Sequence, residues 1–260
     1  MLIVFDIGNT NIVAGVFDDK KLVHKFKINS DINLKIDELI KILQEKTSDY
    51  KFDMCIISSV VNGLDKTLKM ACEKLFDTNI ILLDSSFSEF KFNVENPQTV
   101  GIDRLINTYC IYKKYGKAAI VVDAGTAITI DVISSKGEFL GGVIMSGIKM
   151  KLNSLSQNTS KLPLLELSLP CKAIGKNTEE AMMSGAVIGS SKAIEGLIKK
   201  IKTELNTQEI LIVLTGGDCL LIKDFIDEKI DLIEPNLTLK GLNTIGKVLE
   251  TKFTCQIINS

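Results

Sequence analysis

The chain has 260 residues, of which 45% are hydrophobic and 24% charged, a composition typical of folded globular proteins. Its formal net charge of −1 provides no basic field for nucleic acid or an anionic membrane, so we expect neither as a partner. The sequence contains no apolar run near the roughly 20 residues that a membrane span needs. Asp6 interrupts the first apolar run, which argues against a signal peptide, and we expect a cytoplasmic protein.

The elements expected in the first half begin with a strand hairpin and then alternate between strands and helices. In order, we predict a hairpin at 2–17, strands at 20–28, 53–61 and 79–83, and helices at 34–44, 64–76 and 105–115.

The second half repeats this order. We predict a hairpin at 118–133, strands at 139–144 and 210–214, helices at 148–155, 179–205 (broken near 185–189), 220–226 and 239–249, and a polar loop at 156–170. The alternation of strands and helices predicts an α/β fold with one lobe at 1–116 and a second at 117–260.

Cysteine and histidine usage narrows the chemistry. Six cysteines are scattered without a CxxC pair, and His24 is the single histidine in the sequence. This distribution favours small buried cysteines over a zinc site or a disulfide framework. It also argues against a histidine-based hydrolase triad, so we expect any general base to be a carboxylate.

The first hairpin carries a polar turn, with Asp6 at the end of an apolar strand, followed by Gly8 and then Asn9, Thr10 and Asn11. A glycine lets the backbone approach phosphate oxygens, and the side chains that follow can donate hydrogen bonds to them. Asp6 is suited to hold Mg²⁺ through its hydration shell. A simple β-turn, in which Asp6 and Asn9 satisfy local amides, is an equally good interpretation of this motif by itself.

The second hairpin repeats the pattern at Asp123, Gly125 and Thr126, again between two apolar strands. Two facing carboxylates would need a cation between them, which fits a metal–nucleotide complex. A coincidental hairpin is the less favoured alternative. The repetition predicts two related lobes that face one nucleotide.

Two further motifs are weaker. Gly216 and Gly217 lie between a predicted strand and a predicted helix, where they can pass close to a nucleotide or form a plain connection. Asp103 and Arg104 follow Gly101 at the start of a predicted helix. They can pair a base with an anion clamp, or they can be a helix cap beside a surface arginine, which is commoner.

Taken together, the motifs resemble those of the actin, Hsp70 and hexokinase superfamily of phosphotransfer proteins. Within it, four ordered motifs resemble type III pantothenate kinase, and the resemblance extends from Met1 to about Leu242. The four motifs are Asp6-Ile7-Gly8-Asn9-Thr10-Asn11, Gly101-Ile102-Asp103-Arg104, Asp123-Ala124-Gly125-Thr126-Ala127 and Gly175-x-Asn177-Thr178.

The resemblance implies two ribonuclease H-like lobes with a nucleotide cleft between them, and transfer of the ATP γ-phosphoryl group to the hydroxyl of pantothenate, the first step of coenzyme A biosynthesis. It implies Mg²⁺, a monovalent cation (K⁺ or NH₄⁺) and a homodimer. The implied roles are ATP binding by Asp6, Ile7, Gly8, Asn9, Thr10, Asn11, Ile12, Val13 and Thr126, water-mediated Mg²⁺ binding by Asp6, monovalent cation binding by Asp123, proton abstraction by Asp103, and pantothenate binding by Gly101, Ile102, Asp103, Arg104 and Thr178.

Three places depart from the family pattern. Ser146 replaces the usual proline before Gly147, Val94 stands where an aromatic residue is usual, and Asp37-Glu38 is all that remains of a Thr-x-Asp-Glu run. These changes bear on pantothenate more than on ATP. Two alternatives therefore stay open: a nucleotide-binding regulator of the same fold with little turnover, and a kinase of another small hydroxy acid.

Overall fold

The computed structural model describes residues 1–170 and 172–258, and these form two compact units. Unit 1 contains residues 1–90, 95–111 and the stretch from 237 onwards, and unit 2 contains 91–94 and 112–236. The sequence-based division at 116/117 placed the stretch from 237 in the second lobe, whereas it packs with the first. Each unit therefore draws on more than one stretch of chain.

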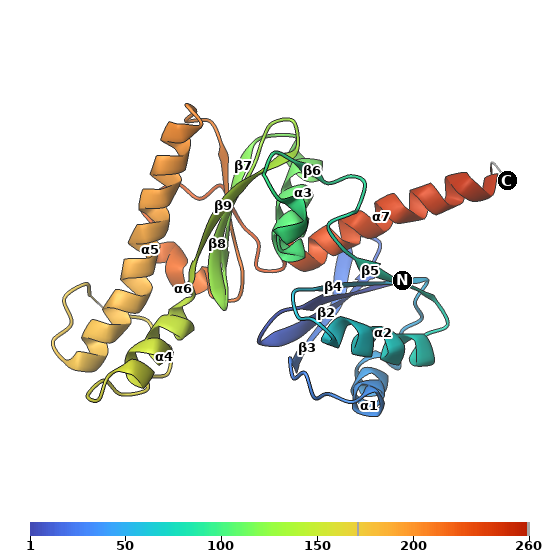
Figure 1. The fold of residues 1–260 in the computed structure, drawn as a ribbon, viewed down its shortest axis with the longest axis horizontal. Coiled ribbons are helices and arrows are strands. Elements are labelled where there is room, and N and C mark those ends of the chain that lie inside the picture. Colours follow the sequence, from blue (N-terminus) through green and yellow to red (C-terminus); the bar gives the residue numbers. More distant parts are fainter. Residues whose placement is uncertain (171, 259–260) are drawn as a thin grey trace. The chain divides into compact units, whose positions relative to one another are not determined.

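Unit 1 is built on a five-stranded sheet in the order β3-β2-β1-β4-β5. Figure 1 labels β2, β3, β4 and β5 of this sheet. Its strands are β1 (Leu2–Ile7), β2 (Asn11–Asp18), β3 (Lys21–Asn29), β4 (Met54–Ser59) and β5 (Asn79–Leu83). Its helices are α1 (Ile36–Thr47), α2 (Leu64–Leu75), the 3-10 turn η1 (Pro97–Thr99), most of α3 (Ile102–Tyr115) and α7 (Leu237–Ile258).

Both faces of the β1–β2–β4 part of this sheet are covered. Ile3, Phe5 and Ile7 alternate along β1 and share one core cluster with residues of α1 and α2. The opposite face meets α7, where a Cβ at Gly246 would lie 2.7 Å from Leu2 and 3.2 Å from Ile56. The close approach of α7 explains why β1 is apolar on both faces.

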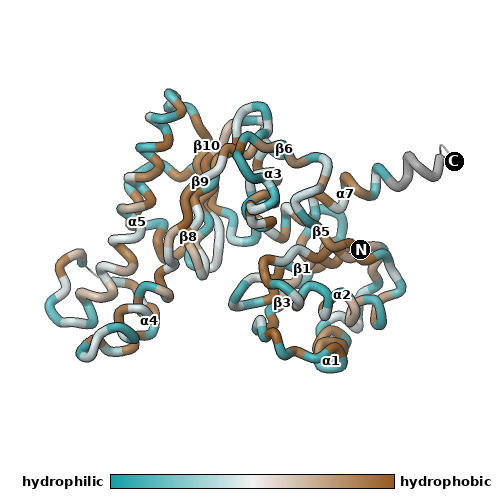
Figure 2. The backbone as a smooth tube through the Cα atoms, viewed as in Figure 1, coloured by the Kyte–Doolittle hydropathy of each residue, from teal (hydrophilic) through white to brown (hydrophobic). Residues whose placement is uncertain are grey.

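Unit 2 is built on a six-stranded sheet in the order β11-β10-β7-β8-β9-β6. Its strands are β7 (Ala119–Ala124), β8 (Ala127–Ile133), β9 (Glu138–Ser146), β10 (Leu211–Thr215), β11 (Leu232–Ile233) and β6 (Lys91–Phe92). Its helices are α4 (Ile148–Asn158), α5 (Thr178–Glu204), α6 (Cys219–Ile222) and the 3-10 turn η2 (Lys223–Phe225). Figure 2 shows the strands β8, β9 and β10 as predominantly hydrophobic.

The two sheets repeat one topology. In unit 1, β1 pairs antiparallel with β2 and parallel with β4, while β3 and β5 extend the sheet on either side. In unit 2, β7 pairs antiparallel with β8 and parallel with β10, while β9 and β11 extend it in the same sense. The predicted α/β class and the internal repeat are confirmed.

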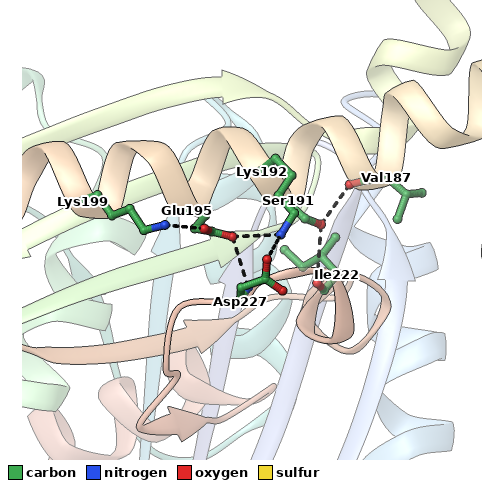
Figure 3. Close-up of polar contacts among 7 residues, drawn as sticks. All are labelled: Val187, Ser191, Lys192, Glu195, Lys199, Ile222 and Asp227. Carbon is green, nitrogen blue, oxygen red and sulfur yellow. Dashed lines mark hydrogen bonds and ion pairs between the residues drawn. The ribbon is translucent and has the colours of Figure 1, made fainter. Parts of the chain in front are cut away.

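The long helix α5 is anchored to the loop after η2 by a charged network (Figure 3). Glu195 accepts hydrogen bonds from Lys199 at 2.5 Å, from Lys192 at 3.0 Å and from the backbone amide of Asp227 at 3.1 Å. Lys192 also pairs with Asp227. The Glu195 side chain is 11% exposed, so the network fixes a nearly buried carboxylate.

The predicted break in this helix near 185–189 is wrong, because α5 runs unbroken from Thr178 to Glu204. Gly185 and Gly189 lie on its exposed side, while Met182, Ile194 and Ile198 bury the opposite side in the core of unit 2. Burial of this apolar side outweighs the roughly 1 kcal/mol that each helical glycine costs.

The cysteines that the structure describes are small core residues, as expected. Cys171 and the side chain of Cys255 lie outside the described residues. The free and buried cysteines are Cys55, Cys72, Cys110 and Cys219. Among the described helices, none combines the length and apolarity that crossing a bilayer requires.

Candidate functional site

The first hairpin places Asp6 at the fifth position of β1, where it pairs with Val13 of β2 and with Ser58 of β4. The turn is closed by the amide of Gly8, which donates to the carbonyl of Asn11 at 3.0 Å. Asn9 at the tip is exposed, as the predicted phosphate-binding role requires.

Two serines that the sequence did not single out contact this hairpin. The Ser58 hydroxyl is fully buried and lies 3.3 Å from both Asp6 Oδ1 and the Phe5 carbonyl. The Ser30 hydroxyl donates to the Gly8 carbonyl at 2.6 Å, and the Ser30 amide donates to the Thr10 carbonyl at 3.0 Å. The register of the paired strands brings Ser58 beside Asp6 and Ser30 beside the turn. No local sequence motif predicts either contact.

The second hairpin places Asp123 at the fifth position of β7, and β1 and β7 share the same pattern of burial. The amide of Gly125 donates to the Ala127 carbonyl at 2.9 Å, which closes this turn as Gly8 closes the first. The amide of Gly147, just before α4, donates to the Thr126 carbonyl at 3.1 Å. Thr126 therefore lies where the turn of the second hairpin meets the residue that precedes α4.

The Gly-Gly turn after β10 packs against Asp123 and Ala124 of the second hairpin. Gly216 has φ +94°, and a Cβ on it would lie 2.3 Å from both Asp123 Oδ1 and the Ala124 carbonyl. Such a backbone conformation and clearance both require glycine. The Asp218 amide donates to the Ala124 carbonyl at 2.8 Å. The structure thus brings the predicted second and third motifs together.

Asp103 lies in the first turn of α3, one residue after the helix begins at Ile102. Its Oδ1 accepts from the backbone amide of Arg104 at 2.9 Å and folds over Gly101, where a Cβ would lie 2.6 Å away. Burial raises the pKa of Asp103, and the Arg104 amide and charge oppose that rise. Arg104 is half-buried, so this pair differs from a helix cap beside a surface arginine.

Thr178 is the first residue of α5, and it is exposed. The helix is capped by Asn177, whose side chain accepts from the Glu180 amide at 2.8 Å, and Glu180 in turn accepts from the Lys176 amide at 2.7 Å. A cavity of about 590 Å³ opens beside this cap, with Leu165, Ile174 and Met183 among its lining residues.

The predicted site residues divide between the two units. Asp6 to Val13 and Gly101 to Arg104 belong to unit 1, while Asp123, Thr126 and Thr178 belong to unit 2. Within the described part of the chain, no three His, Cys, Asp or Glu side chains cluster as a metal site. The single carboxylate of Asp6 at the end of β1 fits Mg²⁺, which usually takes one or two carboxylates and keeps waters and substrate phosphates as its other ligands.

The fold is shared with solved structures. MreB 5 of Spiroplasma citri bound to AMPPNP matches with a TM-score of 0.54 at 11% identity, covering 98% of each chain. A conserved Baf family protein from Campylobacter jejuni matches with a TM-score of 0.63 at 26% identity, covering 96% of this chain and 99% of that one. The two repeated α/β sheets, each with a carboxylate-bearing hairpin, therefore belong to a fold that the MreB and Campylobacter jejuni proteins also have.

The sequence comparison is more specific. The model of the family "Type III pantothenate kinase" matches residues 2–200. A type III pantothenate kinase of Syntrophus aciditrophicus is 36% identical over 253 residues, covering 95% of this chain and 99% of that protein. The chain belongs to the type III pantothenate kinase family.

Proposed function

We propose that the protein transfers the γ-phosphoryl group of ATP to the primary hydroxyl of pantothenate, giving 4′-phosphopantothenate, the first step of coenzyme A biosynthesis. Family membership over residues 2–200 supports this activity. The observation that carries it is structural, and it concerns the glycines of the two hairpin turns.

Neither turn needs its glycine for its own fold. A Cβ at Gly8 would meet only the Asn11 carbonyl, at 3.4 Å, and a Cβ at Gly125 would come no closer than 3.7 Å to any neighbour. Neither residue has a positive φ. The open space above both backbones supports the proposal that a ligand approaches closely there, as the phosphates of a nucleotide would.

We propose that residues 6–13 of the first hairpin and Thr126 of the second hairpin contact ATP. Asp6 would hold Mg²⁺ through water, and Ser58 beside it supports a fixed carboxylate. When bound, the metal would neutralise phosphate charge, which together with positioning of the reactants is most of what phosphoryl transfer requires of a site. Asp123 would bind the monovalent cation, and the close approach of the Gly216 backbone to its Oδ1 supports a carboxylate held in place beside the Gly-Gly turn.

Asp103 is proposed as the base that takes the proton of the pantothenate hydroxyl as the new P–O bond forms. Burial raises its pKa, which makes it a stronger proton acceptor than an exposed carboxylate. Arg104 would bind the pantothenate carboxylate through its planar guanidinium. Gly101, Ile102 and Thr178 are proposed as further pantothenate-binding residues.

The resemblance to the family also supports a homodimer that acts in the cytoplasm. The exposed apolar side chains of Leu164, Leu169 and Ile174 near the start of α5 are consistent with a covered surface in that region.

Incubation with ATP, Mg²⁺, K⁺ and pantothenate, followed by detection of phosphopantothenate, tests the proposal. Formation of this product only when pantothenate is present supports it. If ATP turnover does not depend on pantothenate but does depend on another hydroxy acid, that acid is the substrate in place of pantothenate. ATP binding without turnover on any acceptor would indicate a nucleotide-binding regulator.

A further inference from the structure

Ser30 directly follows β3 and contacts the turn of the first hairpin twice. Its hydroxyl donates to the Gly8 carbonyl at 2.6 Å, and its amide donates to the Thr10 carbonyl at 3.0 Å. Ser30 is 22 residues from Gly8 in sequence, so the third strand of the sheet holds the turn from the side.

The hydroxyl contact fixes the orientation of one peptide plane. The Gly8 carbonyl and the Asn9 N–H belong to the same peptide, and in a trans peptide these two groups point in opposite directions. No peptide bond in the described chain is cis. When Ser30 holds the carbonyl on one side, the N–H of exposed Asn9 is held on the other, where a phosphate oxygen can accept from it.

The internal repeat provides a comparison within the same chain. Gly147 follows β9 as Ser30 follows β3, and its amide donates to the Thr126 carbonyl at 3.1 Å. A Cβ at Gly147 would lie 2.2 Å from the Gly125 carbonyl, so no side chain can occupy that place in unit 2. The backbone contact is common to both units, whereas the hydroxyl contact is particular to unit 1.

We propose that Ser30 is a positioning residue for nucleotide binding, which orients the Gly8–Asn9 peptide toward the phosphates of ATP. The inference rests on the proposed function, because it takes the first hairpin as the phosphate-binding turn. Ser30 itself touches no reacting atom in this assignment.

The test compares Ser30→Ala, which removes the hydroxyl, with Ser30→Thr, which keeps it. Ser134→Ala is the matched control, because Ser134 also follows a strand and its hydroxyl also binds a turn, but at the opposite end of β8 from Thr126. The equilibrium Kd for Mg-ATP is measured by calorimetry without acceptor, together with the KM for each substrate and the Tm.

Loss of one hydrogen bond predicts a rise of about 3- to 10-fold in the Kd and KM for ATP in Ser30→Ala. The KM for pantothenate should change less than about 2-fold on the same reasoning, since the bond lies in the ATP turn. Ser30→Thr should restore most of the ATP affinity, and Ser134→Ala should bind ATP like the wild type.

An unchanged Kd for Mg-ATP in Ser30→Ala would overturn the proposal. So would a loss that affects both substrates equally and follows a lowered Tm, because that pattern indicates a merely structural hydroxyl. If the wild type binds Mg-ATP but does not phosphorylate pantothenate, the proposed function fails, while the Kd comparison still decides the role of Ser30.

Discussion

Replacing Gly147 by alanine should displace the loop that holds Thr126. Gly147 has φ −68° and ψ 168°, a conformation that alanine adopts without strain, so the effect comes from contacts alone. The new Cβ would lie 2.2 Å from the Gly125 carbonyl oxygen and 2.3 Å from that of Thr126. Relief of these contacts requires a shift of about 1 Å, which also breaks the hydrogen bond from the Gly147 amide.

Overpacking of this kind costs about 1–3 kcal/mol, and the lost hydrogen bond about 0.5–1.5 kcal/mol. Together they lower the free energy of unfolding by about 2–4 kcal/mol, which corresponds to roughly 5–15 °C in Tm for a chain of this size. The affinity for Mg-ATP should fall as well, because the displaced carbonyl groups belong to the second hairpin.

Thermal unfolding and calorimetric titration with Mg-ATP measure both effects. Gly196→Ala is the matched control, because Gly196 lies within α5 and a Cβ there would meet nothing within 4 Å. It should raise stability by about 0.5–1 kcal/mol, since alanine favours the helix. If Gly147→Ala has the same Tm and the same affinity for Mg-ATP as the wild type, the close approach of the two loops is not a feature of the protein in solution.

Asp103→Asn should lower kcat by about 10²-fold or more while leaving the Kd for Mg-ATP nearly unchanged; full activity would remove Asp103 as the base. Because burial raises the pKa of Asp103, its ionisation opposes folding at neutral pH, so this variant should have a higher Tm at pH 7 and lose that advantage below the ordinary carboxyl pKa. Replacement of K⁺ by Na⁺ should lower activity if Asp123 binds a monovalent cation, and equal rates in both salts would contradict that role. Hydrogen bonds from Lys199 and Lys192 and from the Asp227 amide lower the pKa of Glu195 to about 2. Glu195→Ala should therefore lower the Tm at neutral pH, with the difference from wild type narrowing as the pH falls toward about 2; a constant difference would contradict the ionic origin.

The hairpins were predictable because their signals are local. An apolar run, an Asp-x-Gly turn and a second apolar run identify β1–β2 and β7–β8, and the repetition of the pattern predicted the repeated topology. The strand expected at 79–83 matches β5, because polar residues bound a short apolar run there. Features whose sequence signal lies within one short segment are predictable because they do not depend on pairing between distant segments.

Features that depend on pairing between distant segments were not predictable. Ser58 lies beside Asp6 because parallel register aligns β4 with β1, across 52 residues of sequence. Ser30 reaches Gly8 because β3 ends level with the turn. The apolar periodicity of α7 predicts a helix, but it does not indicate which of the two sheets the helix covers.

The placement of α7 has a consequence for how the protein is made. The helix contacts β1, β2 and β4, and Leu239 lies against the position of Gly15 in β2. A nascent chain that has emerged as far as residue 236 contains every strand of the first sheet, but one face of that sheet still exposes its apolar side chains to water. The strands of the first sheet therefore complete their packing only after α7 has left the ribosome, and their exposed apolar side chains can aggregate during that interval.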